Sequence, residues 1–89
     1  MNDRIPDSAS ILEWCRAYVA KILDVPLAQV DPGVEVDRLG LDSSTAVALI
    51  MSLEERLGIE LMPEILFDHP TLGGLSKHLA SRVAAERGA

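Results

Sequence analysis

One stretch decides the fold of this chain: DSSTAVALIMSLEERLG, residues 42–58. Asp42 is a favourable N-cap and Gly58 a favourable left-handed C-cap, so the stretch predicts a helix over residues 43–57. Apolar side chains recur inside it at three- and four-residue spacing, which places them on one buried face. That face comprises Ala46, Leu49, Ile50, Leu53 and Leu57. The stretch therefore predicts an amphipathic helix packed on a helical core.

Another helix, the first in chain order, is predicted over residues 10–23. The helix over residues 43–57 is then the second. It opens with Ser10-Ile11-Leu12-Glu13, a capping-box pattern in which the side chains of Ser10 and Glu13 accept hydrogen bonds from each other's backbone amides. Cys15 lies on the predicted inner face, so a buried and unreactive thiol is expected. By helical spacing this face comprises Ile11, Cys15, Tyr18 or Val19, and Ile22.

Two more helices are predicted in the last third of the chain. Residues 64–68 are enough for only a short helix, which ends before His69-Pro70. Thr71 caps a final helix that runs to about Ala85. Gly73 and Gly74 each cost that helix about 1 kcal/mol if they lie in its interior. Its inner face comprises Leu72, Leu75, Leu79 and Val83.

Residues 24–41 show no helical period and contain several turn residues, notably Pro26, the run Asp31-Pro32-Gly33, and Gly40. Apolar residues are spread among them, which predicts a long loop anchored to the core; loops above about 12–15 residues are uncommon unless they are functional. The predicted fold is all-α: a four-helix bundle with a short third helix and a long loop between helices one and two. We expect a polar lead-in over residues 1–9, one domain over 10–85, and a tail over 86–89.

The composition excludes several classes of protein. Cys15 is the only cysteine, so no internal disulfide can form, and no Cys/His set has the spacing of a metal site. The N-terminus lacks the apolar core of a signal peptide, and the longest apolar run, residues 46–51, is too short to span a bilayer. We therefore expect a cytoplasmic monomer with neither a metal ion nor a membrane partner.

Negative charge is concentrated in the middle of the chain. The net charge is −6, yet residues 24–68 hold ten acidic residues against two basic ones, a local charge of −8. Such a block repels phosphate backbones, which argues against a nucleic-acid partner, and would attract a basic protein surface. Charge alone leaves open an ordinary solubilising surface. Val47 and Met51 lie off the core face of helix 43–57, either on the surface or as extra core beneath the long loop.

Ser43 directly follows the predicted cap Asp42, where free helix amides and the helix dipole favour an anion. A phosphate ester at Ser43 would be stabilised there, although many ordinary helices begin with the same residue types. A catalytic serine needs a neighbouring base, and this chain offers only His69 and His78 and no Gly-x-Ser-x-Gly motif. If Ser43 reacts, another protein must therefore activate it.

Two motifs resemble those of the acyl carrier proteins. Leu39-Gly40-Leu41-Asp42-Ser43 is similar to the attachment motif of the family, Gly-x-Asp-Ser at the start of the second helix. Downstream, Leu66-Phe67-Asp68-His69-Pro70-Thr71-Leu72 resembles the Phe-Asp-x-Pro-Thr-Leu segment of polyketide synthase carrier domains. The resemblance covers nearly the whole chain.

This resemblance implies a carrier without catalytic activity. A phosphopantetheinyl transferase would esterify Ser43 with 4'-phosphopantetheine from coenzyme A, and Asp42 would serve as helix cap and in recognition by the transferase. The thiol of the arm would hold acyl groups as thioesters during biosynthesis of polyketides, including antibiotics, or related secondary metabolites. Expected partners are the transferase, an acyl-loading enzyme (an acyltransferase or an acyl-adenylating ligase), and a ketosynthase or other acyl-processing enzyme.

The resemblance also implies a docking face beside Ser43. Ser44 on this face stands where the family usually has Leu or Met, and Ala48 stands where carriers of fatty-acid synthesis commonly have an acid. The second departure favours secondary over primary metabolism. The expected docking residues are Ser44, Val47, Ala48, Met51, Glu54 and Glu55, together with Asp42.

Two alternatives stay open. A peptidyl carrier of a nonribosomal peptide synthetase would use the same arm, but such domains usually have a second glycine where this chain has Leu41. An unmodified acidic helical adaptor would use Ser43 only as part of a helix start, and it would leave both motif matches to coincidence.

Overall fold

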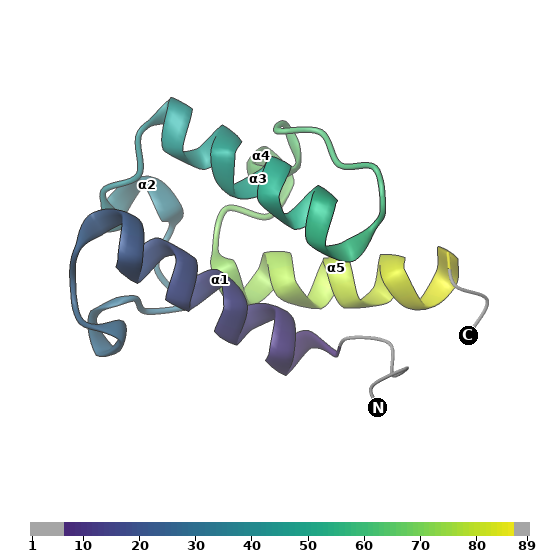
Figure 1. The fold of residues 1–89 in the computed structure, drawn as a ribbon, viewed down its shortest axis with the longest axis horizontal. Coiled ribbons are helices and arrows are strands. Elements are labelled where there is room, and N and C mark those ends of the chain that lie inside the picture. The colour runs from purple at the N-terminus through teal and green to yellow at the C-terminus, as the bar shows by residue number, and fades with distance from the viewer. Residues whose placement is uncertain (1–6, 87–89) are drawn as a thin grey trace.

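The computed structural model describes residues 7–86, which form a helical bundle without strands (Figure 1). This confirms the all-α prediction. The predicted count of four helices is wrong for the described residues, because the long loop itself contains the helical turn α2 and a 3₁₀ turn, η1. The elements in chain order are α1 (Ser8–Leu23), η1 (Leu27–Gln29), α2 (Val36–Leu39), α3 (Ser43–Leu57), α4 (Ile65–Asp68) and α5 (Leu72–Glu86).

The first helix begins earlier than predicted and has a different cap. Asp7 Oδ1 accepts hydrogen bonds from the backbone N and from Oγ of Ser10, both at 2.9 Å, so Asp7 is the N-cap and α1 starts at Ser8. The predicted capping box between Ser10 and Glu13 is wrong, because the carboxylate of Asp7 lies three residues ahead of Ser10 and accepts both of its donors. Glu13 instead pairs with Arg16 at 3.1 Å.

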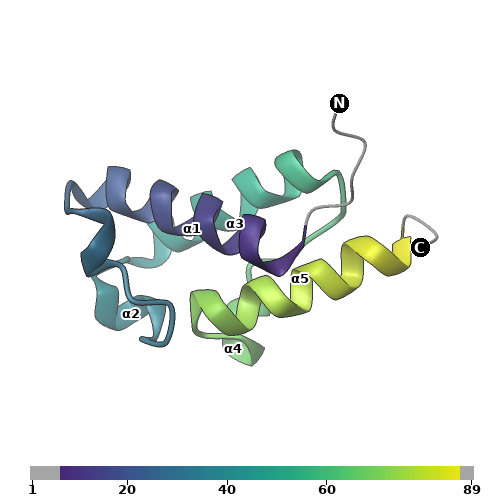
Figure 2. The same cartoon turned by 90° about the horizontal axis from the view of Figure 1, so that it is seen from below.

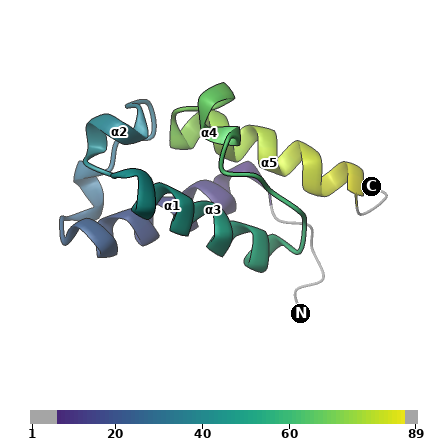
Figure 3. The ribbon, with the colours of Figure 1, turned by 90° about the horizontal axis from the view of Figure 1, so that it is seen from above.

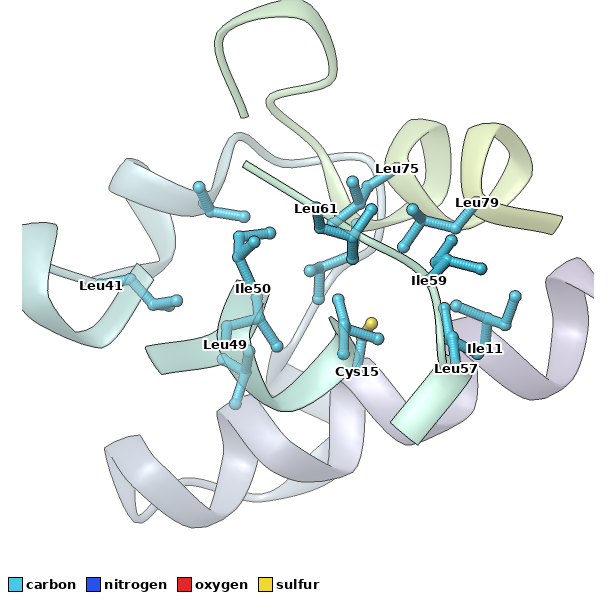
Figure 4. Packing of buried hydrophobic residues seen from close by; sticks show 14 of the residues in the cluster. Ile11, Cys15, Leu41, Leu49, Ile50, Leu57, Ile59, Leu61, Leu75 and Leu79 are labelled. Atoms are coloured by element: carbon cyan, nitrogen blue, oxygen red, sulfur yellow. The ribbon is translucent and has the colours of Figure 1, made fainter. Parts of the chain in front are cut away.

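The core is aliphatic and lies between α1, α3 and α5 (Figures 1 and 4). From α1 it takes Ile11, Cys15 and Val19. Ile22 is 48% exposed, so its predicted place in the core is wrong. The C-terminal end of α1 extends past the start of α5 (Figures 1 and 2), which leaves the last turn of α1 without that neighbour. The other two helices contribute Leu49, Ile50, Leu53 and Leu57 from α3 and Leu72, Leu75, Ser76, Leu79 and Val83 from α5.

Helix α3 has the predicted ends and the predicted buried face. Asp42 caps its start, and Gly58, with φ 71°, forms the left-handed C-cap, donating its backbone N–H to Glu54 O. Ala46, at the first position of the face, is only half-buried. Helix α4 occupies residues 65–68, and Thr71 Oγ1 caps α5 by accepting from Gly74 N at 3.1 Å.

The long loop is anchored, as predicted, by Val30, Val36 and Leu41, which are buried. Arg16 holds one end of the loop, since its guanidinium donates to Val30 O at 2.9 Å and to Leu27 O at 3.0 Å. The other end is attached to the α4–α5 junction.

Three contacts make that second attachment. Val36 N donates to Pro70 O at 2.8 Å, Gly73 N donates to Pro32 O at 2.9 Å, and Glu35 and Thr71 form an isolated antiparallel bridge. Within residues 7–86 no helix has the length and apolarity needed to cross a membrane. The predicted lead-in and tail extend into residues 1–6 and 87–89, outside the described residues, so the predicted domain limits stay predictions.

Candidate functional site

The site is organised by the carboxylate of Asp42, which precedes the first residue of α3. Its Oδ1 accepts from Thr45 N at 2.9 Å, from Thr45 Oγ1 at 2.7 Å and from Ser44 Oγ at 3.4 Å. These hydrogen bonds, led by the one from the Thr45 amide, lower the pKa of Asp42. An ionised carboxylate therefore holds the first turn of α3 in place, and its charge is favourable at a helix N-terminus.

Ser43 differs from the two hydroxyl residues that follow it. Ser44 and Thr45 both donate their hydroxyls to Asp42. Ser43 is exposed, and its Oγ has no hydrogen-bond partner among residues 7–86. Ser43 thus presents a free hydroxyl at the mouth of a fifteen-residue helix, where unpaired amides can stabilise a phosphate.

An open cleft of about 550 Å³ lies beside Ser43, with α2 and α3 on one side and α4 on the other. Figure 3 shows α2 and α4 projecting on the same side of α3. The lining is largely apolar and includes Val47, Leu66 and Phe67. Its charged residues are all acidic: Glu35, Asp37, Asp42 and Glu64. Neither His69 nor His78 lines this cleft, so no imidazole there can act as a base for Ser43.

Most of the predicted docking residues lie at the surface. Val47 is 36% exposed and Met51 is 60% exposed, so the alternative of extra core beneath the loop is wrong. Ser44 and Glu55 are also exposed, whereas Ala48 is half-buried.

Glu54 has a structural role as well as a place near this face. It is half-buried, and its Oε2 accepts from Leu61 N at 3.2 Å. This bond holds the segment after α3 in place, so only part of the Glu54 carboxylate remains for a partner.

Sequence reasoning missed Phe67 as a site residue. It is 85% exposed on α4 and lines the cleft beside Ser43. The motif that contains it was noted, but a helix of four residues has too few positions to show which of them face solvent. The unusual exposure of a phenylalanine is visible only in the structure.

Cys15 plays no part in this site. It is fully buried, and burial raises the pKa of its thiol to about 12, with a hydrogen bond to Ser76 acting weakly in the opposite direction. The predicted burial of Cys15 is confirmed. Since a thiol reacts as its thiolate, its low reactivity is expected and stays a prediction. Figure 4 shows its sulfur among the aliphatic side chains of the core.

The free hydroxyl of Ser43 beside an open cleft is what a covalently attached arm requires, and comparison with known proteins identifies that arm. The family model described as phosphopantetheine attachment site matches residues 13–79. The chain belongs to this family. The carrier function and the predicted cofactor, 4'-phosphopantetheine, are thereby confirmed, and the Ser43 site has the free hydroxyl and the open space that the group needs.

Relatives of this phosphopantetheine attachment domain include polyketide synthases. It is 41% identical over 69 residues to one component of the phenolphthiocerol/phthiocerol polyketide synthase of Mycobacterium tuberculosis. It is 40% identical over 77 residues to the spectinabilin polyketide synthase system protein NorA' of Streptomyces orinoci. These matches cover 78% and 85% of this chain but only 4% and 2% of the relatives. The similarity is therefore to their carrier domains.

Two solved structures share the fold of the domain. A free-standing peptidyl carrier protein from an uncharacterised secondary metabolic pathway of Acinetobacter baumannii has a TM-score of 0.81 and 34% identity, over 86% of this chain and 96% of that one. The HMG-ACPI domain from the CurA module of Lyngbya majuscula has a TM-score of 0.79 and 22% identity, over 97% and 89%. At that identity the second match shows the fold alone.

Proposed function

We propose that Ser43 is the attachment residue and that the arm it carries presents acyl intermediates to the enzymes of a polyketide or related pathway. The observation that supports Ser43 is the difference among three consecutive hydroxyls, of which only this one is free. When bound, 4'-phosphopantetheine supplies the thiol that holds the cargo as a thioester. The chain itself supplies position: a hydroxyl on a capped helix, next to a cleft.

The chemistry of attachment assigns the catalytic work to the transferase. Ser43 Oγ forms a bond to the β-phosphorus of coenzyme A, and adenosine 3',5'-bisphosphate leaves. We assign the hydroxyl proton to a base of the transferase, because no histidine lines the cleft beside Ser43 and the lowered pKa of Asp42 makes its carboxylate a weak base. The chain is thus proposed to be a non-catalytic partner, acting as a monomer in the cytoplasm.

The proposed partners follow from this role. They are the transferase, an acyl-loading enzyme (acyltransferase or acyl-adenylating ligase), and a ketosynthase or other acyl-processing enzyme. The exposed side chains of Val47, Met51 and Glu55 beside Ser43 support a docking surface of small apolar area with an acidic rim. Such a surface suits partners with basic rims that bind briefly and release quickly.

Intact-protein mass spectrometry tests the attachment residue. The chain is incubated with coenzyme A and a broad-specificity phosphopantetheinyl transferase. We expect one added phosphopantetheine on the natural chain and on the matched control Ser44→Ala, and none on Ser43→Ala. Addition to Ser43→Ala, or no addition to the natural chain, would contradict the proposal.

The similarity to a peptidyl carrier supports one second candidate, a carrier of aminoacyl or peptidyl cargo. The relatives among polyketide synthases favour acyl cargo. Once the arm is attached, loading assays with malonyl or aliphatic acyl donors and with aminoacyl adenylates distinguish the two, because only the correct class of loading enzyme will form a thioester on this chain.

A further inference from the structure

Helix α4 is a single turn with few buried contacts beside the Ser43 site. None of its four residues is fully buried, although Ile65 and Leu66 are half-buried and pack against the core. Leu66 and Phe67 face the cleft next to Ser43, whereas Ile65 and Asp68 face a second open cleft of about 510 Å³. Figures 2 and 3 place α4 on the side of α5 that faces away from α1. The helix therefore lines two clefts and is held to the core by only two half-buried side chains.

Two histidines join α4 to α5. His69 directly follows α4, and His78 lies in the second turn of α5. Their rings stack with centroids 4.2 Å apart and planes inclined by 18°. Among residues 7–86, α4 makes no side-chain hydrogen bond or ion pair with α5. The ring stack therefore adds a polar, ionisable contact to the apolar packing of Ile65 and Leu66 against the core.

From this geometry we propose that the stack of His69 and His78, here named the histidine latch, holds α4 in place at neutral pH and releases it in mildly acidic solution. Two neutral imidazoles can stack at this separation, but two imidazolium rings repel each other. Once α4 is released, the cleft beside Ser43 loses one wall.

Burial and the charges around the latch set the direction in which the pKa of His78 shifts. Partial burial lowers the pKa of His78 most, followed by the charges of His69 and of Arg82, which lies one turn further along α5. Asp68 on α4 acts in the opposite direction and has the smallest effect. Two further carboxylates, Glu60 and Glu64, line the same cleft as His78.

The pH window follows from this shift. In the closed state, in which the latch holds α4, the pKa of His78 lies below its ordinary value of 6.5. In the open state, in which α4 is released, the pKa returns to that ordinary value. The stabilisation of the closed state is complete above that value and is lost as the pH falls through it towards the lower pKa. The ratio of open to closed states therefore rises as the pH falls from about 7.5 to about 5.5.

The consequence for cargo depends on the proposed modification of Ser43. If the arm is attached there, the released α4 widens the space available to the arm and its acyl group. The release itself is a property of the unmodified chain, so it can be tested even if Ser43 proves to be the wrong residue.

The test is NMR spectroscopy of the unmodified protein between about pH 7.5 and pH 5.5. We expect the opening equilibrium of amides 65–69, from relaxation dispersion or from hydrogen exchange corrected for intrinsic rates, to rise measurably as the pH falls, with little change in α1. In the matched variants His78→Phe and His69→Phe a ring remains to stack, but the pair can no longer carry two charges. His78→Phe should therefore hold α4 with little pH dependence. His69→Phe removes the repulsion but leaves the effect of burial on His78, so its pH dependence should be smaller than that of the natural chain without vanishing.

Two results would overturn the proposal. One is an α4 opening equilibrium that does not change with pH in the natural chain. The other is the same pH dependence in the phenylalanine variants as in the natural chain. If one variant fails to fold, the other decides the matter, because either substitution removes the repulsion between two charged rings.

Discussion

A single oxygen atom, Asp42 Oδ1, distinguishes three neighbouring hydroxyl residues. It accepts from the hydroxyls of Ser44 and Thr45 and from the Thr45 amide. Since Ser43 does not donate to it, the first residue of the helix keeps its hydroxyl free for the proposed modification. Ser44 contributes to the cap and presents a polar side chain at the surface.

Cys15 allows the arm to be detected without interference. Burial raises the pKa of its thiol to about 12, so almost no thiolate exists at neutral pH. We expect a thiol-specific alkylating reagent to leave the folded unmodified chain unlabelled and to label it once after denaturation. After phosphopantetheinylation, the folded chain should take up one label on the arm. Rapid labelling of the folded unmodified chain would contradict the burial of Cys15.

At the scale of elements, the end of α3 depends on Gly58. Its φ of 71° lies in the left-handed region, and an added Cβ would meet no atom within 4 Å, so the cost of a side chain there is conformational and not steric. Gly58→Ala should lower the free energy of unfolding by about 1 kcal/mol, measured by urea denaturation. The matched control is Gly33→Ala, because φ at Gly33 is not left-handed and an added Cβ would lie 3.4 Å from Asp31 Oδ1, an ordinary contact distance. Equal losses of unfolding free energy in the two variants would contradict this account.

The strength of local signals explains which elements could be predicted from sequence. Helix α3 has a cap at both ends and four buried residues at regular spacing, so its bounds and inner face followed from residues 42–58 alone. Helix α2 has four residues and no side-chain cap, and its backbone is held by Pro70, thirty-four positions after Val36. A contact so distant in sequence leaves no local pattern. Similarly, Ser10 and Glu13 matched a capping box, but the carboxylate of Asp7 accepted the hydrogen bonds instead.

The residues of the site likewise divide into those that the sequence predicts and those that only the structure shows. Ser43, Val47 and Met51 could be found because they belong to a long periodic helix. The cleft could not, since its walls come from three elements and one of them, α4, is a single turn. The sequence therefore places Phe67 in a motif, whereas its exposure becomes visible only in the structure.

At the scale of the whole molecule, the acidic middle of the chain should govern the rate of partner encounter. Glu55→Lys reverses an exposed charge on the proposed docking face, whereas reversal of Glu54 would also break its hydrogen bond to Leu61 N. We expect Glu55→Lys to slow phosphopantetheinylation several-fold at low salt, with the difference shrinking near 1 M salt, where the Debye length is about 3 Å.

Kinetic assays of the transferase at several salt concentrations measure this effect. Glu60→Lys is the matched control, because it makes the same change in net charge at an exposed position off the docking face. If both variants are slowed equally, total charge and not the docking face determines the encounter.

The contact between Gly73 and the long loop has a consequence for anyone who redesigns this domain. Helix propensity recommends replacing Gly73 with alanine, since glycine is a poor helix former. However, a Cβ at this position would lie 3.1 Å from Pro32 O, the atom that accepts the Gly73 amide hydrogen bond. The substitution would push the loop outward where it joins α5. A stabilisation scheme based on helix propensity alone would thus select Gly73 for replacement, although the loop occupies the space that a side chain would need there.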